Sequence, residues 1–171
     1  MVIHLLQGCK IAVTNFAQLF RDYLNMKEVD EPIYPDNLKE AHDLAADSYE
    51  KRRREKIEQE RIEAFSRNVD NYRNLIDEVD DYKFIVPEEP DDLTKEGRKM
   101  NHCVGGYINN VINGISKIIF VRKEDEPYIT IEVRGKAIVQ AKKFRNERPD
   151  ENDDKLIRNW AGRKELTVQS Y

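Results

Sequence analysis

Apolar residues recur in steps of three and four along the first half of the chain, which is the spacing of an amphipathic helix. The first run predicts a short helix, capped by Asn15, whose apolar face consists of Phe16, Leu19, Phe20, Tyr23 and Leu24. Residues 30–35 should end this helix, because the prolines at positions 32 and 35 cannot continue it.

A long helical tract follows, with Asp36 or Asn37 as its cap. It carries a second apolar stripe, which consists of Ile62, Phe65, Val69, Tyr72, Ile76 and Val79. The stripe must pack either on the C-terminal half of the chain or on a second copy, so self-association through the 62–79 helix remains open. Internal packing is favoured, because a sustained coiled coil needs about three to four heptads or more. Residues 50–61 are almost wholly charged and should form a solvated helical face.

From Tyr82 onward the pattern changes to that of short strands and short helices. A strand over residues 83–86 should end at Pro87, and a short helix should begin at Asp91 or Asp92 and end near Gly97. The segments that follow are predicted as a helix over residues 103–113, closed by Gly114, an antiparallel meander of strands over residues 118–122, 128–134 and 137–142, and a last helix after Pro149.

These elements predict an α+β protein with an antiparallel sheet of three or more strands and a helix packed on it. A long helical N-terminal region, residues 1–81, would precede the α+β core, residues 82–171.

The last two strands of the meander predict a hairpin with a defined register. If Ile131 faces Val139 on the core side, residues 134–136 form a three-residue turn in which glycine takes a positive φ. A polar row then lies on the opposite face of the sheet, made by Thr130, Glu132 and Gln140. Such a row can be a ligand site, or simply the solvated face of a half-buried sheet.

Composition narrows the classes of function. Among 171 residues, 33 acidic side chains outnumber 29 basic ones, which gives a net charge of −4. This balance argues against attraction of the whole molecule to nucleic acid, although basic residues cluster at positions 51–54 and 142–145.

Cys9, Cys103 and the three histidines lack the spacing of a zinc site, so no metal is expected, and no cofactor is expected either. The start of the chain lacks a basic leader and no apolar run is long enough for a membrane span, so a cytoplasmic protein without membrane contact is expected.

The richest chemistry lies where His102, Cys103 and Tyr107 surround a pair of glycines. His102 is the main catalytic candidate, because an imidazole with an unperturbed pKa of about 6.5 can accept or donate a proton near neutral pH. Glu132 or Tyr107 could complement it, and Arg122 could bind an anionic group such as phosphate. Metal-independent cleavage of a phosphodiester needs this set of groups. His102 could equally be a hydrogen-bonded helix cap.

Cys103, at the start of a predicted helix, could be a nucleophile, because a helix N-terminus favours the thiolate. A cysteine hydrolase also needs a base, and neighbouring residues on a helix diverge by about 100°, so His102 is poorly placed to serve Cys103. A small packed side chain is therefore the favoured interpretation.

Several short blocks, in a fixed order, resemble the PcfJ-like family. The blocks are P-x-N-L-K-E-A-H-D from Pro35, D-L-x-x-E-G from Asp92, H-C-V-G-x-Y from His102, P-Y-x-T-x-E from Pro127, and V-Q from Val139 followed by Asn146. The resemblance covers about residues 34–160. One departure follows Gln140, where Arg-Gly is expected and this chain has Ala-Lys-Lys, which leaves the role of Asn146 open. Members are encoded on conjugative plasmids, integrative elements and phages, so the resemblance implies a mobile-element setting rather than a reaction.

This setting favours a protein that acts on RNA or a nucleoprotein, as a metal-independent, ribonuclease-like inhibitor of a host defence such as a CRISPR effector and its guide RNA. The catalytic residues would be His102, Glu132, Tyr107 and Arg122. The substrate would contact Thr130, Gln140, Lys142, Lys143 and Arg145. The alternative is a non-enzymatic interaction protein or conjugation accessory factor, in which the long helix and acidic surface dock on a partner.

Overall fold

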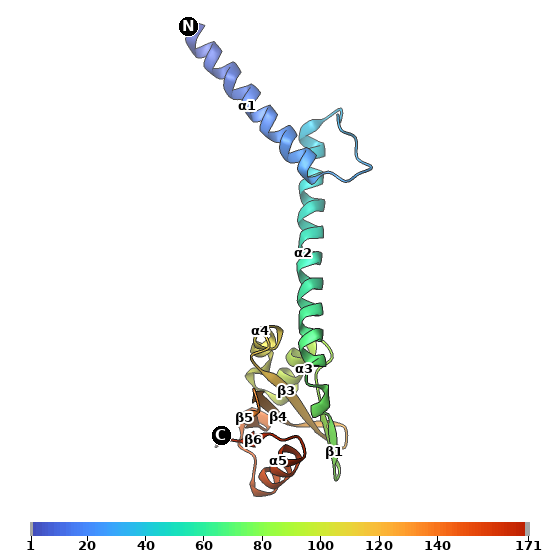
Figure 1. Cartoon of the computed structure of the whole chain (residues 1–171). Coiled ribbons are helices and arrows are strands. Elements are labelled where there is room, and N and C mark those ends of the chain that lie inside the picture. The colour runs from blue at the N-terminus through green and yellow to red at the C-terminus, as the bar shows by residue number, and fades with distance from the viewer. Residues whose placement is uncertain (1, 170–171) are drawn as a thin grey trace. The chain divides into compact units, whose positions relative to one another are not determined.

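The computed structural model describes residues 2–169, with side chains from residue 14 onward, and divides into two compact units, residues 1–59 and 60–171. The protein is α+β, as predicted, with a helical N-terminal region and a mostly antiparallel sheet in the second unit (Figure 1). His4 and Cys9 lie outside the described side chains. The predicted boundary after residue 81 rests on sequence pattern and stays a prediction; the second unit also includes residues 60–81.

The first helix, α1 (Val2–Met26), begins well before Asn15, so the prediction of a short helix capped there was wrong. No proline interrupts this segment, and a helix continues through such a sequence without an internal cap. The predicted break over residues 30–35 is confirmed and lies within a longer non-helical stretch, residues 27–37. Tyr23 packs against this stretch and donates its hydroxyl to the carbonyl of Pro32.

The second helix, α2 (Leu38–Asp70), begins after Asn37, whose side-chain oxygen accepts the backbone N–H of Glu40 at 3.3 Å. Of the two predicted caps, Asp36 and Asn37, Asn37 is the one that makes the capping hydrogen bond. The helix ends at Asp70, before the predicted stripe is complete, and the chain continues through η1 (Arg73–Leu75). Asparagine and aspartate there favour turns over helix.

Most of the stripe is nevertheless buried in the core of the second unit, namely Phe65, Val69, Tyr72 and Val79. Internal packing, the favoured interpretation, is confirmed for these residues. Ile62 and Ile76 are partly exposed, and self-association stays a prediction.

The sheet has six strands in the order of the chain, and each pair of neighbours is antiparallel except the last. The strands are β1 (Asp77–Val79), β2 (Tyr82–Ile85), β3 (Lys117–Lys123), β4 (Glu126–Arg134), β5 (Ala137–Lys142) and β6 (Thr167–Val168). The predicted meander is confirmed as β3 to β5. Two strands were not predicted: β6, which pairs in parallel with β5, and β1, which lies in the stretch predicted as helical.

The predicted register of the last hairpin was wrong. Arg134 pairs with Ala137, so the turn has two residues rather than three, with Gly135 at φ +58°. A bulge between Glu132 and Val133 then shifts the pairing, and Glu132 faces Gln140. The extra residue lets a strand bend, and its position is set by packing that the sequence alone does not display.

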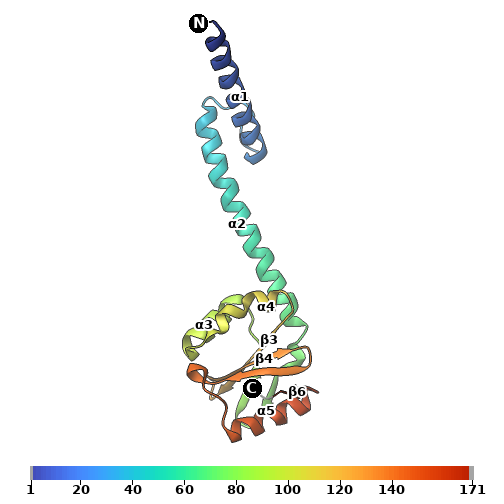
Figure 2. The same ribbon diagram turned by 90° about the vertical axis from the view of Figure 1, so that its left-hand side faces the viewer.

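Helices cover both faces of the sheet (Figure 2). The last helix, α5 (Glu151–Arg163), lies on one face, where Trp160 stacks on Phe84. The other face carries α3 (Pro90–Met100), η2 (Cys103–Tyr107) and α4 (Ile108–Ile112). Helix α3 extends three residues beyond Gly97, its predicted end, and the predicted helix over 103–113 begins as a 3₁₀ turn.

Candidate functional site

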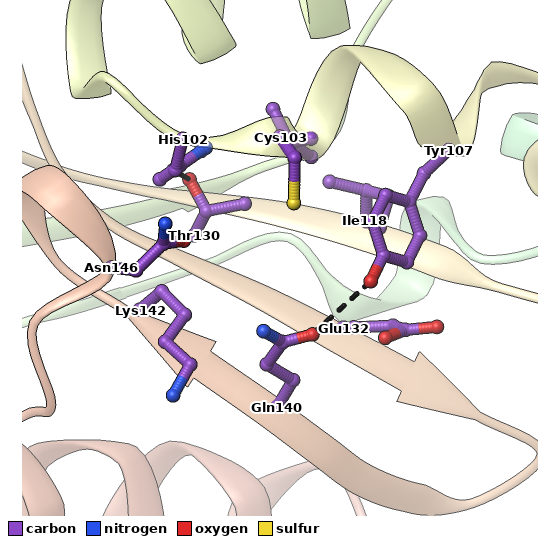
Figure 3. Close-up of a pocket in the computed structure, with 10 residues that line it drawn as sticks. His102, Cys103, Tyr107, Ile118, Thr130, Glu132, Gln140, Lys142 and Asn146 are labelled. Atoms are coloured by element: carbon purple, nitrogen blue, oxygen red, sulfur yellow. Dashed lines mark hydrogen bonds between the residues drawn. The ribbon is translucent and has the colours of Figure 1, made fainter.

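A narrow hollow lies between η2 and the strands β3 to β5 (Figure 3). Its lining consists of His102, Cys103, Val104, Tyr107, Ile118, Thr130, Glu132, Gln140, Lys142 and Asn146. About 30 Å³ of it is open to a water-sized group, which is room for about one or two such groups. The hollow can therefore take one chemical group of a larger ligand rather than enclose a whole small molecule.

The end of α3 places His102 in the lining. Asn101 adopts the left-handed conformation there, at φ +50°, and the backbone N–H of His102 donates to the carbonyl of Gly97 at 3.1 Å. A Cβ at position 97 would lie 2.9 Å from the His102 carbonyl oxygen, so only glycine allows this close approach.

A chain of hydrogen bonds through Thr130 and Glu96 holds the His102 ring. Its Nε2 lies 3.0 Å from the hydroxyl of Thr130, and that hydroxyl donates to Glu96 at 3.2 Å. Glu96 is 2% exposed and is bound by both terminal nitrogens of Arg122, at 2.8 and 2.7 Å. Burial lowers the pKa of His102, so the ring is neutral near pH 7. Although His102 precedes η2, its side chain makes no capping hydrogen bond, so it is not the hydrogen-bonded cap that the sequence also allowed.

The opposite end of the hollow carries Tyr107 and Glu132 (Figure 3). The hydroxyl of Tyr107 donates to Gln140 at 3.3 Å. One oxygen of Glu132 accepts from Ser116 at 2.6 Å and from Arg134 at 2.7 Å. Burial, together with the nearby Glu132 carboxylate, raises the pKa of Tyr107, which therefore keeps its proton at neutral pH.

Cys103 differs from its favoured interpretation as a packed side chain. It is exposed, and its sulfur points into the hollow between His102 and Tyr107 (Figure 3). The chain direction at the start of η2 explains this, because its neighbour Val104 takes the buried position instead.

Two of the predicted cations lie away from the hollow. Arg122 is engaged by Glu96, and Lys143 lies against α5, where its ammonium bonds Asp153 at 2.7 Å and Tyr128 at 3.2 Å. Burial alone would lower the pKa of Lys143, but these hydrogen bonds outweigh it and raise the pKa.

Arg145 is exposed, with its guanidinium over the ring of Phe144. Among the predicted phosphate contacts, all within the described residues, Lys142 is the one cation in the lining.

The sequence argument missed Glu96 and left Asn146 open. Glu96 stood in one of the blocks that resemble the PcfJ-like family, but spacing alone does not reveal a partner on a strand 26 residues later. Asn146 lines the hollow from the 3₁₀ turn η3 (Phe144–Asn146), in which both it and Arg145 take positive φ.

The described side chains contain no group of three or more histidine, cysteine, aspartate and glutamate residues arranged to hold a metal ion. Within the described chain, no helix combines the length and apolar character that a bilayer crossing requires.

Fold and hollow together define an α+β protein in which a loop histidine faces a polar row on an antiparallel sheet. The chain matches the family of PcfJ-like proteins over residues 19–157 and belongs to it. An uncharacterized protein of Listeria innocua serovar 6a is 33% identical over 156 residues, which cover 83% of this chain and 33% of that relative. The chain thus spans about a third of the length of this relative. No solved structure matches the present chain.

Proposed function

We propose that the hollow binds a phosphodiester of RNA and cleaves it without a metal ion, by attack of the neighbouring 2′-hydroxyl. The observation that carries the proposal is that a neutral imidazole, His102, and an ammonium group, Lys142, line the same hollow. The imidazole can accept the proton of the 2′-hydroxyl, and the ammonium can stabilise the negative charge that develops on the phosphate.

The two ends of the hollow suit the two proton transfers. His102 at one end takes the proton as the 2′-oxygen attacks phosphorus and the bond to the 5′-oxygen breaks. Tyr107 at the other end keeps its proton at neutral pH and is the group that returns one to the leaving oxygen. Glu132, whose carboxylate is held by Ser116 and Arg134, supplies negative charge beside Tyr107 and keeps its hydroxyl protonated.

Two further groups fit this assignment. Gln140 and Asn146 offer amide hydrogen bonds to the phosphate and sugar. Arg122, first considered as a phosphate contact, is assigned to the support of His102 instead, because Glu96 occupies its guanidinium. The small open volume suits one phosphate of a polymer that lies across the surface.

The proposed target is RNA held in a host nucleoprotein defence, such as the guide RNA of a CRISPR effector. The mobile-element setting of PcfJ-like proteins supports this target. So does the net charge of −4, which gives little whole-molecule attraction to free nucleic acid, so protein contacts would have to deliver the site to its RNA.

A non-enzymatic interaction protein or conjugation accessory factor is the second candidate, and exposed apolar side chains in the first unit favour it. They are Phe16, Leu24, Val29, Ile33, Tyr34, Leu44, Tyr49 and Ile57. Exposed apolar side chains that form a contiguous patch are typical of protein docking sites. In this case the protein would act at one copy per target rather than by turnover.

Wild-type protein, limiting in amount, should convert a labelled RNA to products that end in a 2′,3′-cyclic phosphate. His102→Gln should lower the rate about 100-fold or more, because a positioned base contributes roughly that factor. The same oligomer with 2′-deoxy nucleotides should stay intact. Cys103→Ser, which changes one atom of the same lining, is the matched control and should retain the rate.

Full activity in His102→Gln would reject the proposed base, and loss of activity in folded Cys103→Ser would assign a role to the sulfur. If wild-type protein at several-fold excess cleaves neither free RNA nor guide RNA in its effector, the enzymatic proposal fails and the docking candidate stands.

Lys142→Ala should weaken RNA binding and lower the slope of log affinity against log salt by roughly 0.7, the value for one phosphate contact on a single strand. Lys143→Ala is the matched control at the next position, and it should leave the slope unchanged, because Asp153 and Tyr128 already engage that ammonium. Salt titrations by fluorescence anisotropy provide the comparison. If Lys143→Ala lowers the slope and Lys142→Ala does not, the phosphate contact is Lys143, on the side of β5 that faces α5, and the proposed contact is wrong.

A further inference from the structure

We infer that Glu96, acting through the Thr130 hydroxyl, is a positioning residue that holds His102 in one tautomer, with the proton on Nε2 and the accepting electron pair on Nδ1. The inference rests on the proposed function where it makes His102 a base. The tautomer itself can be measured without any activity, so the two can fail separately.

The number of available protons determines the direction of each hydrogen bond. The hydroxyl of Thr130 has one proton, and it lies 3.0 Å from His102 Nε2 and 3.2 Å from Glu96 Oε1. A carboxylate can only accept, whereas an imidazole nitrogen can donate or accept. Both contacts are satisfied only if Thr130 donates to Glu96 and His102 Nε2–H donates to Thr130. A neutral ring then has its free electron pair on Nδ1.

Arg122 keeps Glu96 in the accepting state. Its guanidinium is permanently protonated, has no acceptor atom, and binds both carboxylate oxygens. The Glu96 side chain is 2% exposed, so water does not compete for these positions. The guanidinium is in turn held over the ring of Phe120, 4.8 Å from its centroid.

The backbone reinforces the same arrangement. Glu96 and Gly97 lie in the last turns of α3, and the carbonyl of Gly97 accepts the backbone N–H of His102. One helix end therefore positions both the histidine backbone and the carboxylate that orients its ring. Thr130 comes from β4, inside the sheet, so its hydroxyl is held in a fixed place relative to this helix end.

The arrangement specifies which nitrogen can act as the base. A substrate proton must be taken by Nδ1, because Nε2 already has a proton and is directed at Thr130. If Nδ1 is protonated as well, the ring becomes a cation and loses this capacity. Burial disfavours that state and lowers the pKa of His102, outweighing the contact of the ring with its own backbone and the nearby Glu96 carboxylate, which both raise it.

The test is nitrogen NMR of the histidine rings in the full-length protein labelled with ¹⁵N-histidine. At pH 7.5 the His102 ring should show two widely separated nitrogen signals, with the protonated one at Nε2. The spectrum of His102→Gln assigns these signals by their disappearance.

Thr130→Val removes the hydroxyl while keeping the branched shape, and it leaves the Glu96–Arg122 pair intact. Its two His102 nitrogen signals should move toward each other, as exchange between tautomers averages them. Thr130→Ser restores the hydroxyl and should return the wild-type pattern. The backbone amide spectrum of each variant verifies that it is folded.

A wild-type ring protonated on Nδ1, averaged wild-type signals, or an unchanged pattern in Thr130→Val would each overturn the inference. A single Nε2–H tautomer in a protein that cleaves no RNA would uphold the inference and reject the proposed function. RNA cleavage by a wild-type protein whose His102 signals are averaged would overturn the inference and uphold the proposed function.

Discussion

Replacement of Trp160 by alanine is expected to lower the free energy of unfolding by about 3–5 kcal/mol, the cost of emptying a large aromatic site in a core. Trp160 is fully buried, its ring stacks on Phe84 with centroids 4.6 Å apart, and its indole N–H donates to the carbonyl of Leu75 at 3.0 Å. The variant therefore loses packing between α5 and the sheet and leaves a buried carbonyl without its partner. Urea denaturation followed by circular dichroism measures the loss.

Two variants of the same helix serve as controls. Trp160→Phe keeps an aromatic ring against Phe84 and should lose much less stability than Trp160→Ala. Arg158→Ala lies on the exposed side of α5 and should stay within about 0.5 kcal/mol of wild type. Equal losses from Arg158→Ala and Trp160→Ala would contradict the packing of α5 on the sheet.

Glu96→Leu should cost about 3–5 kcal/mol of unfolding free energy, because it leaves the Arg122 guanidinium without a counter-charge in a mostly buried position. The Arg122 side chain is 15% exposed, which keeps the expected loss near the lower end of that range. The double variant Glu96→Leu with Arg122→Met should recover most of the loss, since neither charge then remains in the interior. Thermal and urea denaturation of the three proteins give the comparison.

The exposed ion pair Lys83–Asp125 is the matched control for this buried one. Both partners are largely exposed, and surface pairs contribute little because water screens them. Asp125→Asn should therefore change stability far less than Glu96→Leu, and asparagine tolerates the positive φ at that position. If the single Glu96 variant is as stable as the double one, the Arg122 guanidinium does not need Glu96 as its counter-charge in the interior.

Strands β2 to β5 were accessible from the sequence, because alternation of apolar residues and the glycine at position 135 are local signals. Strand β1 was not, because its residues continue the spacing of the helical stripe. The ends of α2 and α3 were less accessible. The spacing of Tyr72 and Val79 continues the helical stripe, yet both side chains reach the core from outside the helix. The bulge beside Glu132 and the two-residue strand β6 depend on packing across distant segments, which a local pattern does not contain.

The sequence indicated which residues gather around the hollow better than it indicated which side chains bind one another there. His102, Tyr107, Thr130, Glu132 and Gln140 all line the hollow, because residue type and strand alternation indicate which face each side chain takes. The assignment of Arg122 to phosphate did not take its neighbours into account. An arginine side chain is available to an anionic ligand only where no carboxylate of the protein already binds it. Here Glu96 binds Arg122, and the sequence does not specify that α3, which carries Glu96, lies against β3.

The strand order of the sheet has a consequence for how the chain folds. Each strand from β2 to β5 pairs with the strand that precedes it in the chain, so most of the sheet can grow by closing one loop after another. The longest of these loops, between β2 and β3, carries α3, η2 and α4. Closing a short loop costs little chain entropy, so β3, β4 and β5 should form the folding nucleus. The helices that complete the hollow would then dock late.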